Sequence, residues 1–161
     1  MQQVSDCRLS ELMALLSRFS LNLELVTDDS SIPGSYWGDP EAGLIQSTVY
    51  VRSDTPVHSL LHEASHAICM SDSRRKTLHT DAGGDFDEEN AVCYLQILMA
   101  DTIPGFSSQQ CMLDMDEWGY TFRLGSTRRW YEEDASDALS WLKRTKATAL
   151  IAISSQNQSA F

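Results

Sequence analysis

The chain has 161 residues, of which 42% are hydrophobic, and a formal net charge of −11. This length suits one domain whose core needs no disulfide or zinc support. The acidity argues against a nucleic-acid or anionic-membrane surface, because both are recognised by clustered Lys and Arg. The sequence has neither a signal-peptide pattern nor an apolar run near the roughly 18 residues of a membrane span. We therefore expect a cytoplasmic protein with reduced cysteines.

Hydrophobic periodicity predicts an α+β domain. Apolar residues at i, i+3 and i+4 predict helices, and alternation of apolar and polar residues predicts strands. The predicted elements are, in chain order, helix 6–19 capped by Ser5 or Asp6, strand 21–26, loop 27–43, strand 44–52, helix 54–70, polar loop 71–85, helix 86–101, helix 107–117 and helix 127–146. We expect a short antiparallel sheet, a single domain over residues 1–150 and a frayed tail over residues 151–161.

The helix predicted at 54–70 carries an H-E-x-x-H motif, His62-Glu63-Ala64-Ser65-His66. Residues four apart lie on one helical face, so both imidazoles can reach one metal ion. Glu63 projects beside that ion, where it can take a proton from a bound water as general base. The helix is apolar on nearly every side, which is typical of a buried helix. Buried polar side chains need partners, and a metal ion would supply one.

A third ligand is expected downstream, because catalytic zinc sites use three protein ligands and leave the fourth position to water. The next predicted helix opens with Asp87, Glu88 and Glu89. Glu88 shares its face with the apolar residues that should pack on the motif helix, whereas Glu89 lies about 100° away, on the face of Cys93 and Gln96. We rank Glu88 first, Glu89 second and Asp87 third. The alternative is that all three are solvated residues favoured by the helix dipole.

A motif helix followed by a helix-borne glutamate resembles the gluzincin branch of the zincin metallopeptidases. The element order resembles the small ImmA/IrrE-type metallopeptidases, in which the third ligand opens a glutamate-x-x-alanine stretch followed by an aromatic residue and a leucine pair. In this chain Glu88, Ala91, Tyr94 and Leu98-Met99 fall in matching places. The resemblance implies a zincin-like fold, a Zn²⁺ cofactor and a peptide or protein substrate.

A second resemblance is to the elongation factor P hydroxylase family. That family has an H-E-x-S-H motif, a short apolar stretch and an Arg-Arg pair. In this chain the motif is followed by Ala67-Ile68-Cys69 and by Arg74-Arg75. The resemblance implies Fe²⁺ in place of Zn²⁺ and hydroxylation of a modified lysine on a translation factor. Two histidines and one carboxylate also describe a non-haem iron site, so the ligand types do not separate the two metals.

The loop between the two ligand helices adds three candidate residues. His79 is a candidate catalytic donor to a substrate oxyanion, with a surface histidine as the alternative. Asp81 and Asp85 are candidate acceptors for the ring N–H of a ligand histidine. The strand at 44–52 is the expected sheet edge for an extended peptide. We therefore expect a zinc metallopeptidase-like hydrolase, with an iron-dependent hydroxylase or a non-catalytic metal-binding domain as alternatives.

Overall fold

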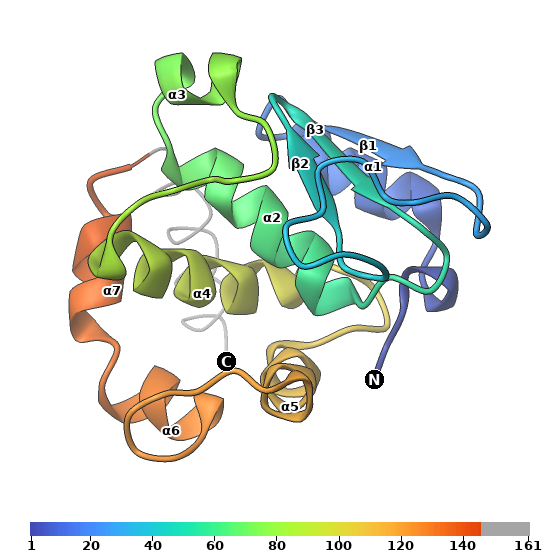
Figure 1. Ribbon diagram of the computed structural model, residues 1–161. Helices are drawn as coiled ribbons and strands as arrows, with labels where there is room; N and C mark the ends of the chain where they lie inside the picture. Colours follow the sequence, from blue (N-terminus) through green and yellow to red (C-terminus); the bar gives the residue numbers. More distant parts are fainter. Residues whose placement is uncertain (146–161) are drawn as a thin grey trace.

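The computed structural model describes residues 1–145 and has the predicted α+β fold (Figure 1). The predicted tail at 151–161 and the end of the last predicted helix lie outside these residues. The elements are, in chain order, η1 (Val4–Asp6), α1 (Leu9–Ser17), β1 (Asn22–Leu25), β2 (Gly43–Ile45), β3 (Thr48–Val51), α2 (Val57–Cys69), α3 (Asp72–Thr77), α4 (Phe86–Ala100), α5 (Ser108–Trp118), α6 (Thr127–Glu133) and α7 (Ser136–Leu142).

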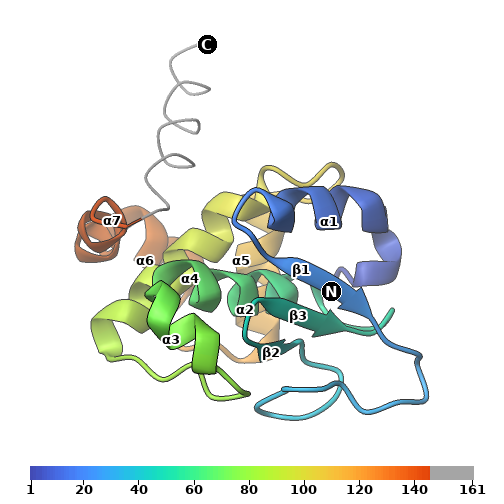
Figure 2. The ribbon, with the colours of Figure 1, turned by 90° about the horizontal axis from the view of Figure 1, so that it is seen from above.

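A three-stranded sheet in the order β1-β3-β2 forms one side of the molecule. β1 pairs with β3 in parallel and β2 pairs with β3 antiparallel, so the prediction of an antiparallel sheet is wrong. The physical reason is the connection at residues 26–42, which carries the chain past β3 to the far edge before β2 begins. Figure 2 looks down on the sheet, with α1 beyond β1 and α2 beside β2 and β3.

The predicted strand at 44–52 is a hairpin of β2 and β3 rather than one strand. Ile45 pairs with Thr48, and the chain reverses at Gln46, whose φ is 51°. The Gln46 N–H donates to the carbonyl of Leu78 at 2.8 Å, outside the sheet. Residues 44–51 contain no Gly or Pro that would signal a turn, and this is why the reversal was not predicted.

The outer edge of the hairpin is covered by other segments of the chain. The Leu44 N–H donates to the Gly34 carbonyl at 3.2 Å, and the Thr80 N–H donates to the Leu44 carbonyl at 2.9 Å. Ile45 also forms an isolated bridge with His79. β3 is the central strand, so the expectation that residues 44–52 offer a free edge to a peptide is wrong. The main-chain groups that would bind the peptide are already paired.

Helices α2 and α4 pack against each other through the middle of the molecule, and α2 also contacts β2, β3 and α5. Every residue of α2 is buried except His62 and Glu63. The prediction of a buried motif helix is confirmed. Only His62 and Glu63 of α2 reach solvent, and the candidate site lies at these two motif residues.

Two boundaries in the first half of the domain differ from prediction. The predicted polar loop at 71–85 contains α3, which begins where the Ser71 hydroxyl accepts the Arg74 N–H. The first helix, α1, starts later than predicted and has no side-chain cap, so the cap at Ser5 or Asp6 is wrong. Short helices such as α3 bury little apolar surface, and periodicity gives a weak signal for them.

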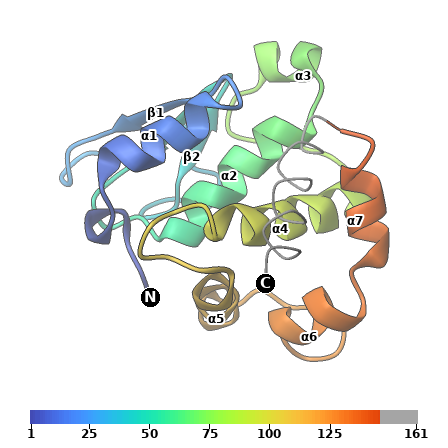
Figure 3. The same ribbon diagram turned by 180° about the vertical axis from the view of Figure 1, so that it is seen from behind.

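The C-terminal helices enclose the other side of α4 (Figure 3). The helices predicted at 86–101 and 107–117 match α4 and α5 closely. The segment predicted as one helix from 127 is instead α6 and α7, separated at Asp134-Ala135. In these two helices Trp130, Ala138 and Leu142 are buried.

Candidate metal centre

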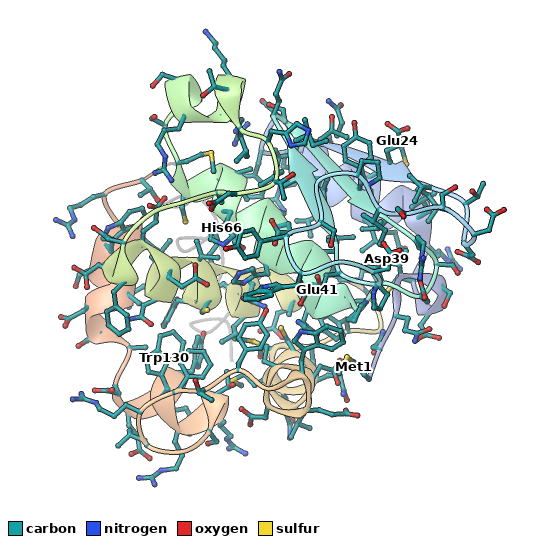
Figure 4. All side chains as sticks on the ribbon, in the orientation of Figure 1. Met1, Glu24, Asp39, Glu41, His66 and Trp130 are labelled. Atoms are coloured by element: carbon teal, nitrogen blue, oxygen red, sulfur yellow. The ribbon has the colours of Figure 1, made fainter. Side chains whose placement is uncertain are left out.

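The two motif histidines meet on the exposed end of one α2 face. Their Nε2 atoms lie 3.1 Å apart, and their rings are perpendicular with centroids 4.7 Å apart. The side chains are 16% exposed for His62 and 10% for His66. Figure 4 labels His66 near the centre of the molecule, where α2 crosses α4. The spacing of four residues therefore produces the convergence that the sequence predicted.

The third side chain at this position is Glu89, not Glu88. Its Oε1 lies 3.3 Å from His62 Nε2 and its Oε2 lies 3.4 Å from His66 Nε2. His62, His66 and Glu89 form the candidate metal-binding group of the described residues. The prediction that Glu88 takes this place is wrong. α4 is buried on almost all sides, so its apolar stripe did not identify the face that meets α2, which is the face of Glu89, Cys93 and Gln96.

Glu88 instead is buried and forms an ion pair with the partly exposed Arg74 of α3. Arg74 Nη1 lies 2.9 Å and 3.2 Å from its two carboxylate oxygens, and Arg74 Nη2 donates to the Ala82 carbonyl at 2.8 Å. The neighbouring Arg75 is buried and donates to the Ala67 carbonyl in the last turn of α2, at 2.8 Å and 3.1 Å. The Arg-Arg pair therefore joins α3 to both ligand helices.

The three side chains fit a divalent cation in chemistry and in spacing. Two imidazoles and one carboxylate are a ligand set used by Zn²⁺ and by non-haem Fe²⁺. A tetrahedral ion with bonds of about 2.0–2.1 Å separates its ligand atoms by about 3.3 Å. His62 Nε2 and His66 Nε2 lie 3.1 Å apart, and each lies 3.3–3.4 Å from a different oxygen of the Glu89 carboxylate. Taken as one ligand atom from each residue, the three atoms lie within 4.8 Å of one another. The geometry alone does not select between the two metals.

Glu63 lines the cleft beside these ligands. The pKa of its carboxyl group is raised to about 7, mainly by burial; His62 lowers this pKa, and the negative charges of Glu41 and Glu89 raise it. A carboxyl group whose pKa lies near neutral pH is suited to general acid–base chemistry. Its position is the one that the motif predicts for a general base.

The candidate centre opens into a cleft of about 720 Å³. The cleft lining combines acidic and aromatic side chains from residues 36–41, from the 80–83 segment and from the end of α5, namely Tyr36, Trp37, Glu41, Asp81, Trp118 and Tyr120. Trp118 Nε1 donates to Glu41 Oε1 at 2.8 Å, and this bond joins two sides of the cleft (Figure 4 labels Glu41). The sequence placed Tyr36 and Trp37 in a loop but gave no signal that this loop reaches the motif.

The other predicted site residues do not reach the ligand histidines. His79 is exposed, lies outside the cleft lining and pairs through Nδ1 with the Thr80 hydroxyl at 2.8 Å, so its catalytic role has no support. Asp81 lines the cleft, but its Oδ1 accepts the Gly83 N–H. Asp85 caps α4 by accepting the Glu88 N–H at 2.9 Å. Both aspartates serve local backbone structure, as Asx residues in turns and caps commonly do.

Gln96 was not predicted as a functional residue, although it contacts a ligand histidine directly. It is fully buried on α4, and its Oε1 lies 2.7 Å from His62 Nδ1. A polar side chain on the same helical face as Glu89 and Cys93 was the signal available in the sequence. Its side-chain oxygen lies where an acceptor from Asp81 or Asp85 was expected, beside a ring nitrogen of a candidate ligand histidine.

No protein-family model, curated protein or solved structure matches this chain. Among the helices of residues 1–145, none combines the length and apolar character that crossing a membrane requires. Inferences about function therefore rest on the geometry of the cleft and on the chemistry of its side chains.

Proposed function

We propose that the protein is a metal-dependent enzyme in which His62, His66 and Glu89 bind one divalent cation and Glu63 is the general base. The best-supported reaction class is hydrolysis of a peptide or protein by a metallopeptidase-like, zincin-type mechanism. The observation that carries the proposal is the convergence of two Nε2 atoms and one carboxylate within 3.1–3.4 Å at the base of an open cleft.

The number of ligands favours a catalytic centre over a structural one. Structural zinc sites are closed by four protein ligands, whereas catalytic sites use three and keep one position open. The candidate group has three members among the described residues, and it faces the cleft rather than the core. This arrangement weighs against the alternative of a non-catalytic metal-binding domain.

A bound divalent cation would polarise a substrate carbonyl and lower the pKa of a coordinated water. Glu63 would accept the proton of that water and then deliver it to the leaving group, which is the usual exchange of base and acid roles. Glu41 and Glu89 lie close enough to raise the Glu63 pKa, so they favour the protonated form needed for the second step. The Trp118–Glu41 bond would hold that side of the cleft in place during the reaction.

The test is the metal content of the protein purified without added metal, combined with assays of Glu63→Gln. We expect about one zinc per chain and cleavage of peptides by the wild type. Because Glu63 is not among the ligands, Glu63→Gln should keep the metal and lose at least roughly 100-fold in turnover, the contribution of a general base. Unchanged turnover in a metal-loaded Glu63→Gln protein would remove the proposal.

An iron-dependent hydroxylase acting on a protein side chain is the second candidate, and one observation favours it. The β2 edge is occupied by Gly34 and Thr80, so an extended peptide cannot pair there, whereas a single projecting side chain can enter the cleft. Iron in the purified protein, with oxygen consumption in the presence of a protein substrate, would select this candidate. Zinc with peptide cleavage and no oxygen consumption would reject it.

A further inference from the structure

The strongest unassigned feature beside the centre is the Gln96 side chain, which spans the two ligand helices. Its Nε2 donates to the backbone carbonyl of His58 at 3.1 Å, and its Oε1 lies 2.7 Å from His62 Nδ1. The His58 carbonyl can only accept, so it fixes which end of the amide is the nitrogen. The amide oxygen therefore faces the imidazole, and His62 Nδ1 must carry the proton of this hydrogen bond.

We propose that Gln96 is the positioning residue of the centre and holds His62 in the tautomer that leaves Nε2 free to bind a cation. Protonation at Nδ1 places the lone pair of the neutral ring on Nε2, which points at His66 and Glu89. Metal-binding histidines commonly use their other nitrogen in this way, with a carboxylate, a carbonyl or water as the acceptor. Here the acceptor is a neutral side-chain amide, which adds no charge to the site.

His66 provides an internal contrast. Its Nδ1 is buried and has no hydrogen-bond partner. The His66 Nε2 lies 3.1 Å from the His62 Nε2 and 3.4 Å from Glu89 Oε2. Because a lone pair on His62 Nε2 and the Glu89 carboxylate can both accept, they favour a proton on His66 Nε2, which is the tautomer opposite to that of His62. We infer that His62 is preorganised for the cation, whereas His66 adopts its binding tautomer only when the cation is present.

Cys93 is a further α4 side chain beside His62, one helical turn before Gln96. Burial raises the pKa of its thiol, so it stays protonated, and a thiol sulfur is a weak acceptor. Cys93→Ala is therefore the matched control, because it removes a buried neighbour of His62 from the same helical face without removing the amide.

The experiment compares wild type, Gln96→Met, Gln96→Glu and Cys93→Ala in two measurements. The first is the histidine ring ¹⁵N spectrum of the metal-free proteins, recorded at alkaline pH so that the His62 ring is neutral and the spectrum reports which nitrogen carries its single proton. We expect His62 to carry its proton on Nδ1 in wild type, Gln96→Glu and Cys93→Ala, and to lose this preference in Gln96→Met. The second is zinc affinity by chelator competition, which should fall by roughly 10–100-fold in Gln96→Met and be restored in Gln96→Glu.

A folded Gln96→Met protein with the wild-type His62 tautomer and zinc affinity would overturn the inference. If that variant does not fold, Gln96→Asn replaces it, because the shorter amide cannot span both His62 and the His58 carbonyl, and the same two results are expected. The inference rests on the proposed function only for its metal measurement. Wild-type protein that binds no metal would refute the proposed function, whereas the tautomer measurement would still decide the role of Gln96.

Discussion

Two adjacent carboxylates at the start of α4 have opposite environments. The Glu88 side chain is 7% exposed and paired with Arg74, whereas that of Glu89 is 47% exposed and faces only imidazole nitrogens and the cleft. A buried carboxylate needs a cationic partner, and Glu88 has one within the protein. Glu89 has a comparable partner only if a cation binds. The comparison separates a buried glutamate that is paired within the protein from a half-exposed one that is left as a candidate metal ligand.

The largest expected effect is on metal binding, and it comes from replacing each of these two glutamates separately with alanine. Glu89→Ala removes one of three ligands and should weaken zinc binding by more than roughly 100-fold, the upper end for loss of a supporting contact. Glu88→Ala should keep the metal and lose stability by about 1–2 kcal/mol, since hydrogen bonds to a charged group are lost. Chelator competition and thermal unfolding measure the two effects. Metal loss in Glu88→Ala alone would reverse the assignment.

The contrast between paired and unpaired polar side chains also predicts that the folded protein loses stability in acid, through His58 of α2. His58 is fully buried with an unpartnered Nε2, and burial, together with the charge of His62, lowers its pKa to about 3. The unfolded chain takes up this proton below about pH 6.5 and the folded protein does not. Stability from His58 is therefore complete above pH 6.5 and falls by roughly 1.4 kcal/mol per pH unit toward pH 3.

This prediction is tested by urea unfolding of metal-free protein with chelator present. His58→Met should be less sensitive to acid than wild type, by roughly 3 kcal/mol over two pH units below 6.5. His79→Asn, at an exposed histidine, serves as the control and should follow the wild-type slope. Equal slopes in wild type and His58→Met would show that His58 is not the group responsible.

A pair of adjacent glycines tests whether Glu88 is held in place by its surroundings. A Cβ on Gly84 would lie 2.2 Å from Glu88 Oε2, whereas a Cβ on Gly83 would meet nothing within 4 Å. Both have positive φ, so each alanine variant carries a backbone cost of about 1–2 kcal/mol. Gly84→Ala should lose a further 1–3 kcal/mol or so because the carboxylate must leave Arg74. Equal melting temperatures would refute this placement.

The sequence predicted the motif helix, the histidine pair and most helices, because each depends on local spacing. It did not predict the choice of Glu89, because α4 is apolar on several faces and only its packing against α2 decides which face meets the histidines. The contact between Gln96 and His62 joins residues 34 apart in the chain. The Gln46 turn and the covered β2 edge also depend on segments distant in sequence, which periodicity does not relate.

The smallest effect is expected at the Trp118–Glu41 bond, which joins the loop before β2 to the end of α5 at the cleft. Trp118→Phe keeps an aromatic ring against His58 and removes the indole N–H. Trp118 is 37% exposed, so the stability change should be only about 0.5–1 kcal/mol, while amide exchange in residues 34–42 should become faster. Trp37→Phe, at a residue 80% exposed, is the control and should leave exchange unchanged. If exchange is the same in all three proteins, the bond does not restrain the loop.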